Sequence, residues 1–426
     1  MAVRTLSKLG FKLAFVATSL ALAGSAYAAG FAINELSPEL QATAIAGAGS
    51  ATNDVTAMAF NPATLATLKS SQIYLGTSYI APTVRYSNAR ANIDGAPVTG
   101  INNEDSVAPD AWVPDAYIGW VNSTPVKAGL ALTAPWGLRT DYDTSWVGRN
   151  NALNSSIKTF DIAPTLAMQV DKYLALGASF HAQKASVDYS NSIASLSNPA
   201  ILTADLSGTS WGYGYSLGAL ITPVQGSNLG ISYRSRIHQE IEGAADITSP
   251  ITILDGSPGA TASITLPDQI LISGSQVLNN KWTVMASALW THWALMNGIN
   301  ANLTNGVADD TTMDWRNTWF FSLGAKYQLN QRWALMGGTA YDQTPTINQY
   351  RDPRIPGSNR YWLTTGVDYQ PSQNLAFDLT YEHIFMASQT ISVSQSGPSN
   401  LPTTNSIYAD YSGYANIIAA GVRYTF

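Results

Sequence analysis

The chain of 426 residues contains no cysteine, so it has no disulfide bonds. Without them, an exported protein of this size must draw its stability from a large core or from a closed sheet. Charged residues are also scarce, at 12% of the chain against about 25% in ordinary globular domains. The formal net charge of −6 gives no support for nucleic-acid binding, because proteins of that class usually carry a basic stripe.

Long apolar runs are missing too, apart from one short run near the N-terminus. Arg4, Lys8 and Lys12 precede the apolar residues 13–22, and Ala26-Tyr27-Ala28 forms a small-x-small cleavage site. The run is too short to cross a bilayer as a helix. We therefore predict that residues 1–28 are a signal peptide and that the mature chain begins near Ala29.

Period-2 alternation and aromatic residues are abundant in the rest of the chain, which has 12 Trp and 21 Tyr. After about residue 70 the sequence divides into alternating segments separated by turn residues, the weak signal expected of a membrane barrel. The predicted strands are 71–86, 109–122, 126–138, 157–171, 173–189, 209–224, 228–241, 263–278, 281–298, 313–329, 332–346, 358–370, 374–392 and 409–426.

The connections and the strand faces agree with this interpretation. Short connections such as 330–331 alternate with long ones such as 87–108, which is typical of barrels with short periplasmic turns and long outer loops. In the segment 313–329, Phe321 and Leu323 share a face that would meet lipid, and polar residues occupy the other face. We predict an all-β protein, a transmembrane antiparallel β-barrel of about 14 strands over residues 70–426, in a Gram-negative outer membrane.

Residues 29–69 precede the barrel and are rich in small residues and poor in charge. A barrel of this width is not filled by its own side chains, because its diameter grows with strand number. Asn61 and Pro62 break any regular element here. We predict an N-terminal hatch, a plug inside the lumen, rather than a flexible periplasmic tail.

Several blocks together resemble one family, the outer-membrane transporters of long-chain fatty acids and related hydrophobic compounds (FadL/TodX-like). They are AGFAINE (29–35), NPATL (61–65), AWVPDAYIGW (111–120), GLALTAPWGLRTDYD (129–143), LPDQILISG (266–274), RWALMGGTAYDQTP (332–345) and RIPGSNRYWLTTGVDY (354–369). The resemblance implies a monomeric fourteen-stranded barrel with Asn61, Pro62 and Ala63 in its hatch. It also implies ligand capture at outer loops, binding inside the barrel, and lateral release through an inward kink in the third strand.

The third predicted strand contains a local reason for such a kink. Pro135 lies in its interior and removes a ladder donor, and Gly137 weakens the pairing further. We expect the lateral opening at these two residues. The alternative is that Pro135 lies above the membrane, where the strand becomes a loop.

Four residues are candidates for ligand binding. An acyl chain requires apolar contacts, and its carboxylate requires a cation or donors. Arg316 faces the lumen by strand alternation and is the first choice for the carboxylate, although it could instead pair with Asp314. Arg360 also faces inward. The resemblance implies that Phe31 reaches into the ligand pocket, and it loosely implies a role for Lys184, which alternation places on the lipid-facing side.

Other functions are open alternatives. Some members of the family carry monoaromatic hydrocarbons, which need no cation. A barrel enzyme, either a lipase or a protease, would need a nucleophile beside a histidine, and none of the four histidines lies in such a motif. A general porin would not begin with a hatch. We expect no catalytic residues, no cofactor and no metal, and as partners a hydrophobic small molecule, outer-membrane lipids and the barrel assembly machinery.

Overall fold

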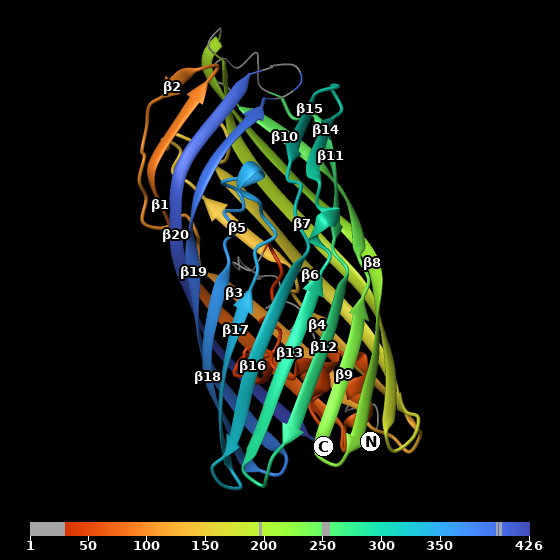
Figure 1. The fold of residues 1–426 in the computed structure, drawn as a ribbon. Coiled ribbons are helices and arrows are strands. Elements are labelled where there is room, and N and C mark those ends of the chain that lie inside the picture. The colour runs from red at the N-terminus through yellow and green to blue at the C-terminus, as the bar shows by residue number, and fades with distance from the viewer. Residues whose placement is uncertain (1–29, 196–197, 249–255, 398, 400–402) are drawn as a thin grey trace.

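The computed structural model describes residues 30–195, 198–248, 256–397, 399 and 403–426, so the predicted signal peptide lies outside the described residues. Figure 1 shows a tall, tilted barrel with the N-terminal segment, in red, inside its lower half. All pairings between neighbouring strands are antiparallel, and the last strand pairs with the first from Gln72–Thr425 upward, which closes the sheet. Closure removes the free edges that an open sheet would leave unpaired.

The wall has fourteen strands, as predicted, and five of its positions are split into two labelled pieces. A short strand β2 (Ala96–Val98) folds back on the outer end of β1. In chain order, the wall consists of β1 (Gln72–Ile93), β3 (Ala111–Trp120), β4 (Val126–Thr133) with β5 (Gly137–Asp141), β6 (Asn154–Gln169), β7 (Leu174–Ser195), β8 (Asn198–Val224), β9 (Ser227–Arg234) with β10 (Ile237–Thr248), β11 (Gly259–Leu266) with β12 (Gln269–Val277), β13 (Trp282–Thr291) with β14 (Gly298–Leu303), β15 (Ala308–Thr312) with β16 (Thr318–Gln328), β17 (Trp333–Asp342), β18 (Arg360–Ser372), β19 (Leu375–Ser396) and β20 (Thr404–Thr425).

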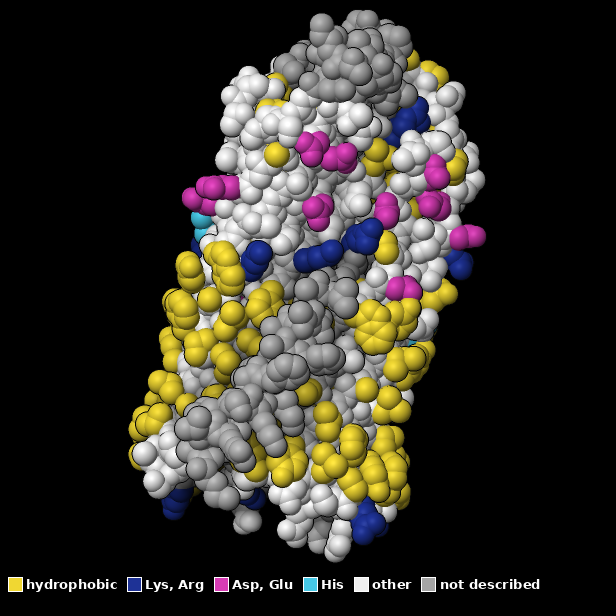
Figure 2. Space-filling view, turned by 180° about the vertical axis from the view of Figure 1, so that it is seen from behind, with side chains coloured by type: hydrophobic (Ala, Val, Ile, Leu, Met, Phe, Trp, Pro, Cys, Tyr) yellow, Lys and Arg dark blue, Asp and Glu magenta, His cyan; other side chains and the backbone are white. Residues whose placement is uncertain are grey.

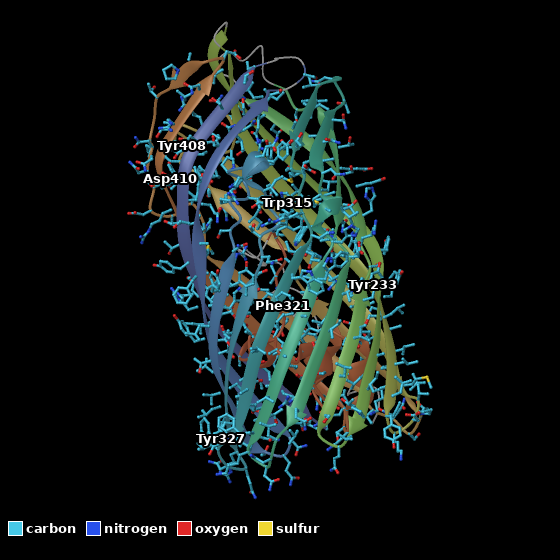
Figure 3. All side chains as sticks on the ribbon, in the orientation of Figure 1. Tyr233, Trp315, Phe321, Tyr327, Tyr408 and Asp410 are labelled. Atoms are coloured by element: carbon cyan, nitrogen blue, oxygen red, sulfur yellow. The ribbon has the colours of Figure 1, made fainter. Side chains whose placement is uncertain are left out.

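The outer surface of the wall carries an apolar belt, which Figure 2 shows in yellow below a zone rich in charged side chains. Phe321 and Leu323 of β16 are 47% and 64% exposed, whereas Ser322 between them is buried. The predicted assignment of the two faces is confirmed here. In Figure 3, Phe321 lies midway along the wall and Tyr327 lies near the end with the short turns. There the Tyr327 ring contacts the Trp282 ring at 4.7 Å, as expected of an aromatic girdle at a membrane interface.

Several predicted strand limits were wrong. The outer ends of β7, β8, β19 and β20 run far beyond the predicted limits, because above the membrane both faces of a strand are polar and the apolar alternation disappears. The predicted strands 126–138, 228–241 and 263–278 are each interrupted by two or three irregular residues. The segment 313–329 becomes a strand only at Thr318, so the residues before it do not follow the alternation.

Residues 30–69 lie inside the barrel and are almost entirely buried, in agreement with the predicted hatch. Their regular structure is limited to four short turns, α2 (Pro38–Gln41), η2 (Ala48–Ser50), η3 (Val55–Ala59) and η4 (Pro62–Thr67). Asp54 and Asn61 cap the last two turns with their side-chain oxygens. Within the described residues, no helix has the length and apolar character needed to cross a membrane.

The inner wall donates hydrogen bonds to backbone carbonyls of the hatch. Thr364 Oγ1 of β18 donates to the Ala42 carbonyl at 3.0 Å, and Thr380 Oγ1 of β19 donates to the Pro38 carbonyl at 2.7 Å. A buried carbonyl without a donor costs about 1–3 kcal/mol. The polar inner face of the barrel therefore serves as the hydrogen-bonding partner of an irregular plug.

The wall also approaches the hatch closely where it lacks side chains. A Cβ at Gly338 of β17 would lie 2.3 Å from the backbone carbon of Thr43 in the hatch. At the neighbouring Gly337, which faces the opposite side, the nearest atom would be 3.6 Å away. Only Gly338 is thus required for close packing of the hatch against β17.

We predict that Gly338→Ala lowers the free energy of unfolding by about 1–3 kcal/mol, because the added methyl group overpacks the contact with Thr43. The matched Gly337→Ala should leave stability unchanged or slightly higher, since alanine restricts the unfolded chain. Thermal unfolding of the purified barrel in detergent, followed by its heat-modifiable mobility on gels, measures both. Equal midpoints for the two variants would contradict the close seating of the hatch.

Candidate functional site

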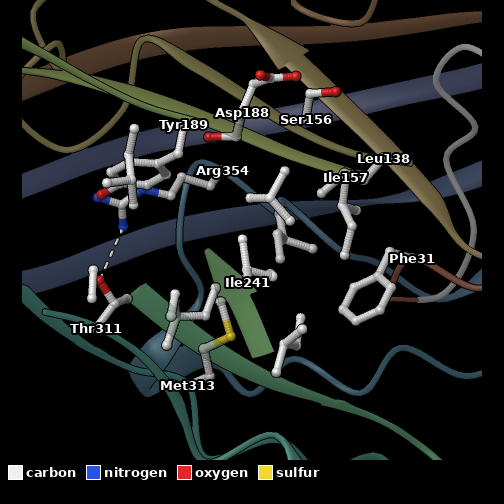
Figure 4. Close-up of a pocket in the computed structure, with 18 of the residues that line it drawn as sticks. Phe31, Leu138, Ser156, Ile157, Asp188, Tyr189, Ile241, Thr311, Met313 and Arg354 are labelled. Atoms are coloured by element: carbon white, nitrogen blue, oxygen red, sulfur yellow. Dashed lines mark hydrogen bonds between the residues drawn. The ribbon is translucent and has the colours of Figure 1, made fainter. Parts of the chain in front are cut away.

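A cavity lies in the upper half of the lumen, directly above the hatch. It encloses about 840 Å³ of empty space, part of it open to solvent. Its walls are mainly apolar side chains from β5, β6, β10 and neighbouring strands, including Leu138, Ile157, Ile241 and Met313. Figure 4 shows these side chains between Arg354 on one side and Phe31 on the other. The cavity is therefore mainly apolar, with Arg354 at one end and a few polar residues, including Asp188, in its lining.

Arg354 forms the cationic end and belongs to the outer connection between β17 and β18. Its Nη1 lies 2.7 Å from Asp352 Oδ2, its Nη2 hydrogen-bonds to the Tyr189 hydroxyl, and its guanidinium lies 4.4 Å from the Tyr189 ring centroid. Burial lowers the pKa of Arg354 to about 9, so the side chain still carries its charge near neutral pH. Its Nε is buried and has no hydrogen-bond partner among the described residues.

Phe31 forms the opposite end and is 1% exposed. Its ring centroid lies 4.8 Å from that of Trp293, 5.8 Å from that of Trp315 and 5.9 Å from that of Trp136. Such edge-to-face and tilted contacts each add about 0.5–1.5 kcal/mol beyond area burial. The first described residues of the hatch are thus held by an aromatic cage that closes the floor of the cavity.

The third strand is broken beside this floor. β4 ends at Thr133, β5 begins at Gly137, and the irregular residues between them include Pro135. Pairing of β3 with the third strand stops at Ala116–Leu132, so β5 pairs only with β6 among the described strands. The expected break at Pro135 and Gly137 is therefore present, and it leaves one edge of β5 without a wall strand.

Hatch residues pair with that edge instead. The Ile33 amide donates to the Pro135 carbonyl at 2.9 Å, and the Gly137 amide donates to the Phe31 carbonyl at 2.9 Å. Ala32 and Trp136 face each other between these two bonds as an antiparallel bridge. Phe31 thus lies at the cavity floor, and it pairs together with Ala32 and Ile33 with the free edge of the third strand.

The Asn61-Pro62-Ala63 segment anchors the lower part of the hatch. Asn61 Nδ2 donates to the carbonyls of Gly49 at 2.7 Å and Ala219 at 3.0 Å, while its Oδ1 accepts from the Ala63 amide at 3.0 Å. One side chain therefore joins two hatch turns to β8. Asparagine is needed because no other side chain of this length offers both an acceptor and two donors in one plane.

The three basic residues predicted to bind the ligand, Arg316, Lys184 and Arg360, do not line the upper cavity. The prediction that Arg316 faces the lumen was wrong, because it lies in the irregular segment before β16, is exposed and donates from Nε to the Thr344 carbonyl at 3.3 Å. Lys184 lies on the outer face of β7, as the alternation indicated and against the loose resemblance. Arg360 does face inward and is 2% exposed, but it lies 3.9 Å from Asp342 and does not line the cavity.

The structure also brings together a polar group that the sequence did not reveal. His181 Nδ1 lies 2.7 Å from Asp161 Oδ2, and His181 Nε2 lies 2.7 Å from Ser216 Oγ. No sequence motif indicated this contact of His181 with Ser216, because the two residues lie 35 positions apart in the chain. Asp161 also accepts from Arg234 Nη2 at 3.0 Å, so its carboxylate is shared between the histidine and a guanidinium. The three side chains come from β6, β7 and β8, and only the strand register could have predicted their contact.

A plugged outer-membrane barrel with an internal apolar cavity is the class of protein that these features define. The chain belongs to the family described as outer membrane protein transport protein (OMPP1/FadL/TodX), whose model matches residues 19–426. It is thus an outer-membrane transport protein.

The similarity to individual relatives extends over most of the chain. It is 24% identical over 417 residues to the long-chain fatty acid transport protein of Escherichia coli K12, covering 88% of this chain and 91% of the relative. It is 25% identical over 417 residues to outer membrane protein P1 of Haemophilus influenzae, covering 88% and 90%.

Two solved structures share the fold. A FadL homologue of Pseudomonas aeruginosa superposes with a TM-score of 0.86 at 22% identity, covering 93% of this chain and all of that one. The toluene transporter TbuX of Ralstonia pickettii superposes with a TM-score of 0.68 at 19% identity, covering 92% and all of that chain. At these identities the likeness establishes the fold alone.

Proposed function

We propose that this transporter takes up long-chain fatty acids and binds them in the upper cavity with the carboxylate at Arg354. The observation that carries the proposal is Arg354, with its unpartnered Nε, at one end of a mainly apolar cavity. Each buried CH₂ of an acyl chain contributes about 0.8 kcal/mol, so the apolar length of the cavity favours a long chain. A guanidinium is suited to the head because its hydrogen bonds to carboxylates are charge-assisted.

Uptake of monoaromatic hydrocarbons is the second candidate. A neutral hydrocarbon would use the apolar walls and would gain nothing from Arg354, whose charge is already balanced in part by Asp352. The toluene transporters among the similar structures support this alternative only through their fold. We favour fatty acids because burying Arg354 at the cavity is costly unless a ligand uses its remaining donor.

Release is proposed to occur sideways, through the gap that residues 31–33 now close. A ligand entering the cavity from the outer loops meets Phe31 at the floor, and movement of Phe31 together with Ile33 would remove the two hydrogen bonds that cover the edge of the third strand. Opening the floor and opening the wall would then be one event. The ligand would then enter the lipid of the outer membrane. We propose that the protein works as a monomer and that the barrel assembly machinery inserts it into the membrane.

We propose no enzymatic role, although Asp161, His181 and Ser216 have the connectivity of a hydrolase triad. Arg234 competes with His181 for Asp161, and backbone amides around Ser216 in β8 are engaged in the ladders with β7 and β9. An oxyanion hole requires free donors at the reacting carbonyl. The group is better explained as a polar contact within the lumen.

We predict that Arg354→Gln weakens binding of a long-chain fatty acid to the purified protein by about tenfold or more, because a hydrogen bond to a charged group is lost. Binding of the corresponding methyl ester should stay unchanged, since the ester carries no charge. Arg316→Gln is the matched control and should change neither. Calorimetric titration in detergent measures affinity and should saturate at one ligand per chain.

Because Arg354→Gln removes the ion pair between Arg354 and Asp352, the double variant Asp352→Asn/Arg354→Gln is tested beside it. Loss of acid binding in Arg316→Gln but not in the Arg354 variants would contradict the assignment of the head group. Toluene binding without any fatty acid binding would favour the hydrocarbon alternative. Hydrolysis of the methyl ester that disappears in Ser216→Ala would contradict the proposed absence of catalysis.

We also predict that a disulfide between Ala32→Cys and Trp136→Cys stops uptake in cells while leaving ligand binding intact. The two residues are directly opposed in an antiparallel bridge, which suits disulfide geometry, and the natural chain has no competing thiol. Uptake of radiolabelled fatty acid is compared before and after reduction, with each single cysteine variant as control. Full uptake by the oxidised double variant would rule out release through this gap.

A further inference from the structure

A second, more polar cavity lies below the first and next to the break in the third strand. It encloses about 510 Å³ of empty space, part of it open to solvent, and is lined by Ala32, Ile33 and Asn34 of the hatch, by Pro135 of the break, and by Ser216 and Arg234 of the wall. Phe31 lines the upper cavity, and the next residues line the lower one. The first few hatch residues therefore form the partition between two cavities.

Arg234 is the cation of this lower cavity, at the end of β9. Its side chain is 12% exposed, and its Nη2 donates to Asp161 Oδ2 at 3.0 Å. Among the described residues, no other hydrogen bond is made by its guanidinium, which has five N–H donors. Most of its hydrogen-bonding capacity is thus unused by the described protein groups, in a side chain that lines the cavity.

Asp161 does not depend on Arg234 alone. The same Oδ2 is 2.7 Å from Nδ1 of His181, whose ring is fixed on its other side by Ser216. If the Arg234 side chain turned toward a ligand, Asp161 would keep the histidine as a partner. The guanidinium has further N–H donors that can bind a second carboxylate while Asp161 keeps a hydrogen-bond partner.

We propose that the lower cavity is a second binding site for the carboxylate of the transported fatty acid, occupied between the upper cavity and the gap in the wall, with Arg234 as its cation. The inference rests on the proposed function. A fatty acid that leaves Arg354 carries its charge into a partly buried lumen, where an unpaired carboxylate is strongly disfavoured. A cation beside Pro135 removes that penalty at the point where the acyl chain would enter the gap.

The test compares the rate of fatty acid uptake into cells with the equilibrium binding of fatty acid to the purified protein. Arg234→Gln should lower the rate of uptake of a radiolabelled long-chain fatty acid by about tenfold, as expected for one lost charge-assisted contact. Binding to the purified protein, which reports the upper cavity, should change by less than about twofold, because this variant leaves Arg354 in place. Uptake of the methyl ester should be unaffected.

The matched control is Arg236→Gln, since this arginine lies two residues further on, is 50% exposed and pairs with Asp268 at 3.0 Å. It should take up the acid at the wild-type rate. Because Arg234→Gln leaves the buried Asp161 with fewer partners, Asp161→Asn/Arg234→Gln is measured in parallel, with folding checked by heat-modifiable mobility. The double variant should show the same selective loss.

An unchanged rate of acid uptake in both Arg234 variants would overturn the proposal. An equal fall for the acid and the ester would also overturn it, because Arg234 would then act only on the structure. Failure of the proposed function is recognised separately, since the wild-type protein itself would then neither bind nor take up the acid.

Discussion

Two hydrogen bonds between the hatch and the broken third strand are the constraint on which the rest of this structure depends. A barrel avoids exposed strand edges by closing, yet here the wall itself contains one, because Pro135 cannot continue the ladder. Residues 31–33 cover that edge from inside the lumen. The wall is therefore completed by a segment that is not part of it.

This arrangement is the basis for the proposed division of the hatch into a fixed part and a part that moves. The fixed part is bound to the wall by hydroxyl donors such as Thr364 and Thr380 and by the Asn61 side chain. The N-terminal part is held by the edge pairing and by the aromatic cage around Phe31. The free energy of local unfolding varies within many proteins, and the segments that move in function are usually those with the lowest local stability.

The sequence predicted the fold because a membrane imposes the same alternation on every strand. Phe321 outward and Ser322 inward follow from that rule, as does the count of fourteen strands. The predicted orientation of Arg316 was wrong because the strand alternation was extended through residues 313–317, whereas the strand begins at Thr318. Arg354 was missed although its segment had been noted, since it lies between Pro353 and Pro356 in a connection without periodicity.

The contact among Asp161, His181 and Ser216 could not be predicted from the sequence, for a different reason. The three residues lie on three strands, and their meeting depends on the register between β6, β7 and β8. A slip of one residue would turn a side chain to the other face. The residues that share one face of a strand can be predicted from the alternation. The residues that meet across two strands can be predicted only when the register of the two strands is known.

The central claim is that ligand binding releases residues 31–33 while the rest of the hatch stays seated. Amide hydrogen exchange with and without saturating fatty acid tests it most directly. Exchange should accelerate at Ile33 and Gly137, whose amides form the edge pairing, and should stay slow at Ala63, whose amide is capped by Asn61. Equal acceleration at all three amides would mean that the hatch moves as one body, and unchanged exchange at Ile33 and Gly137 would contradict the account.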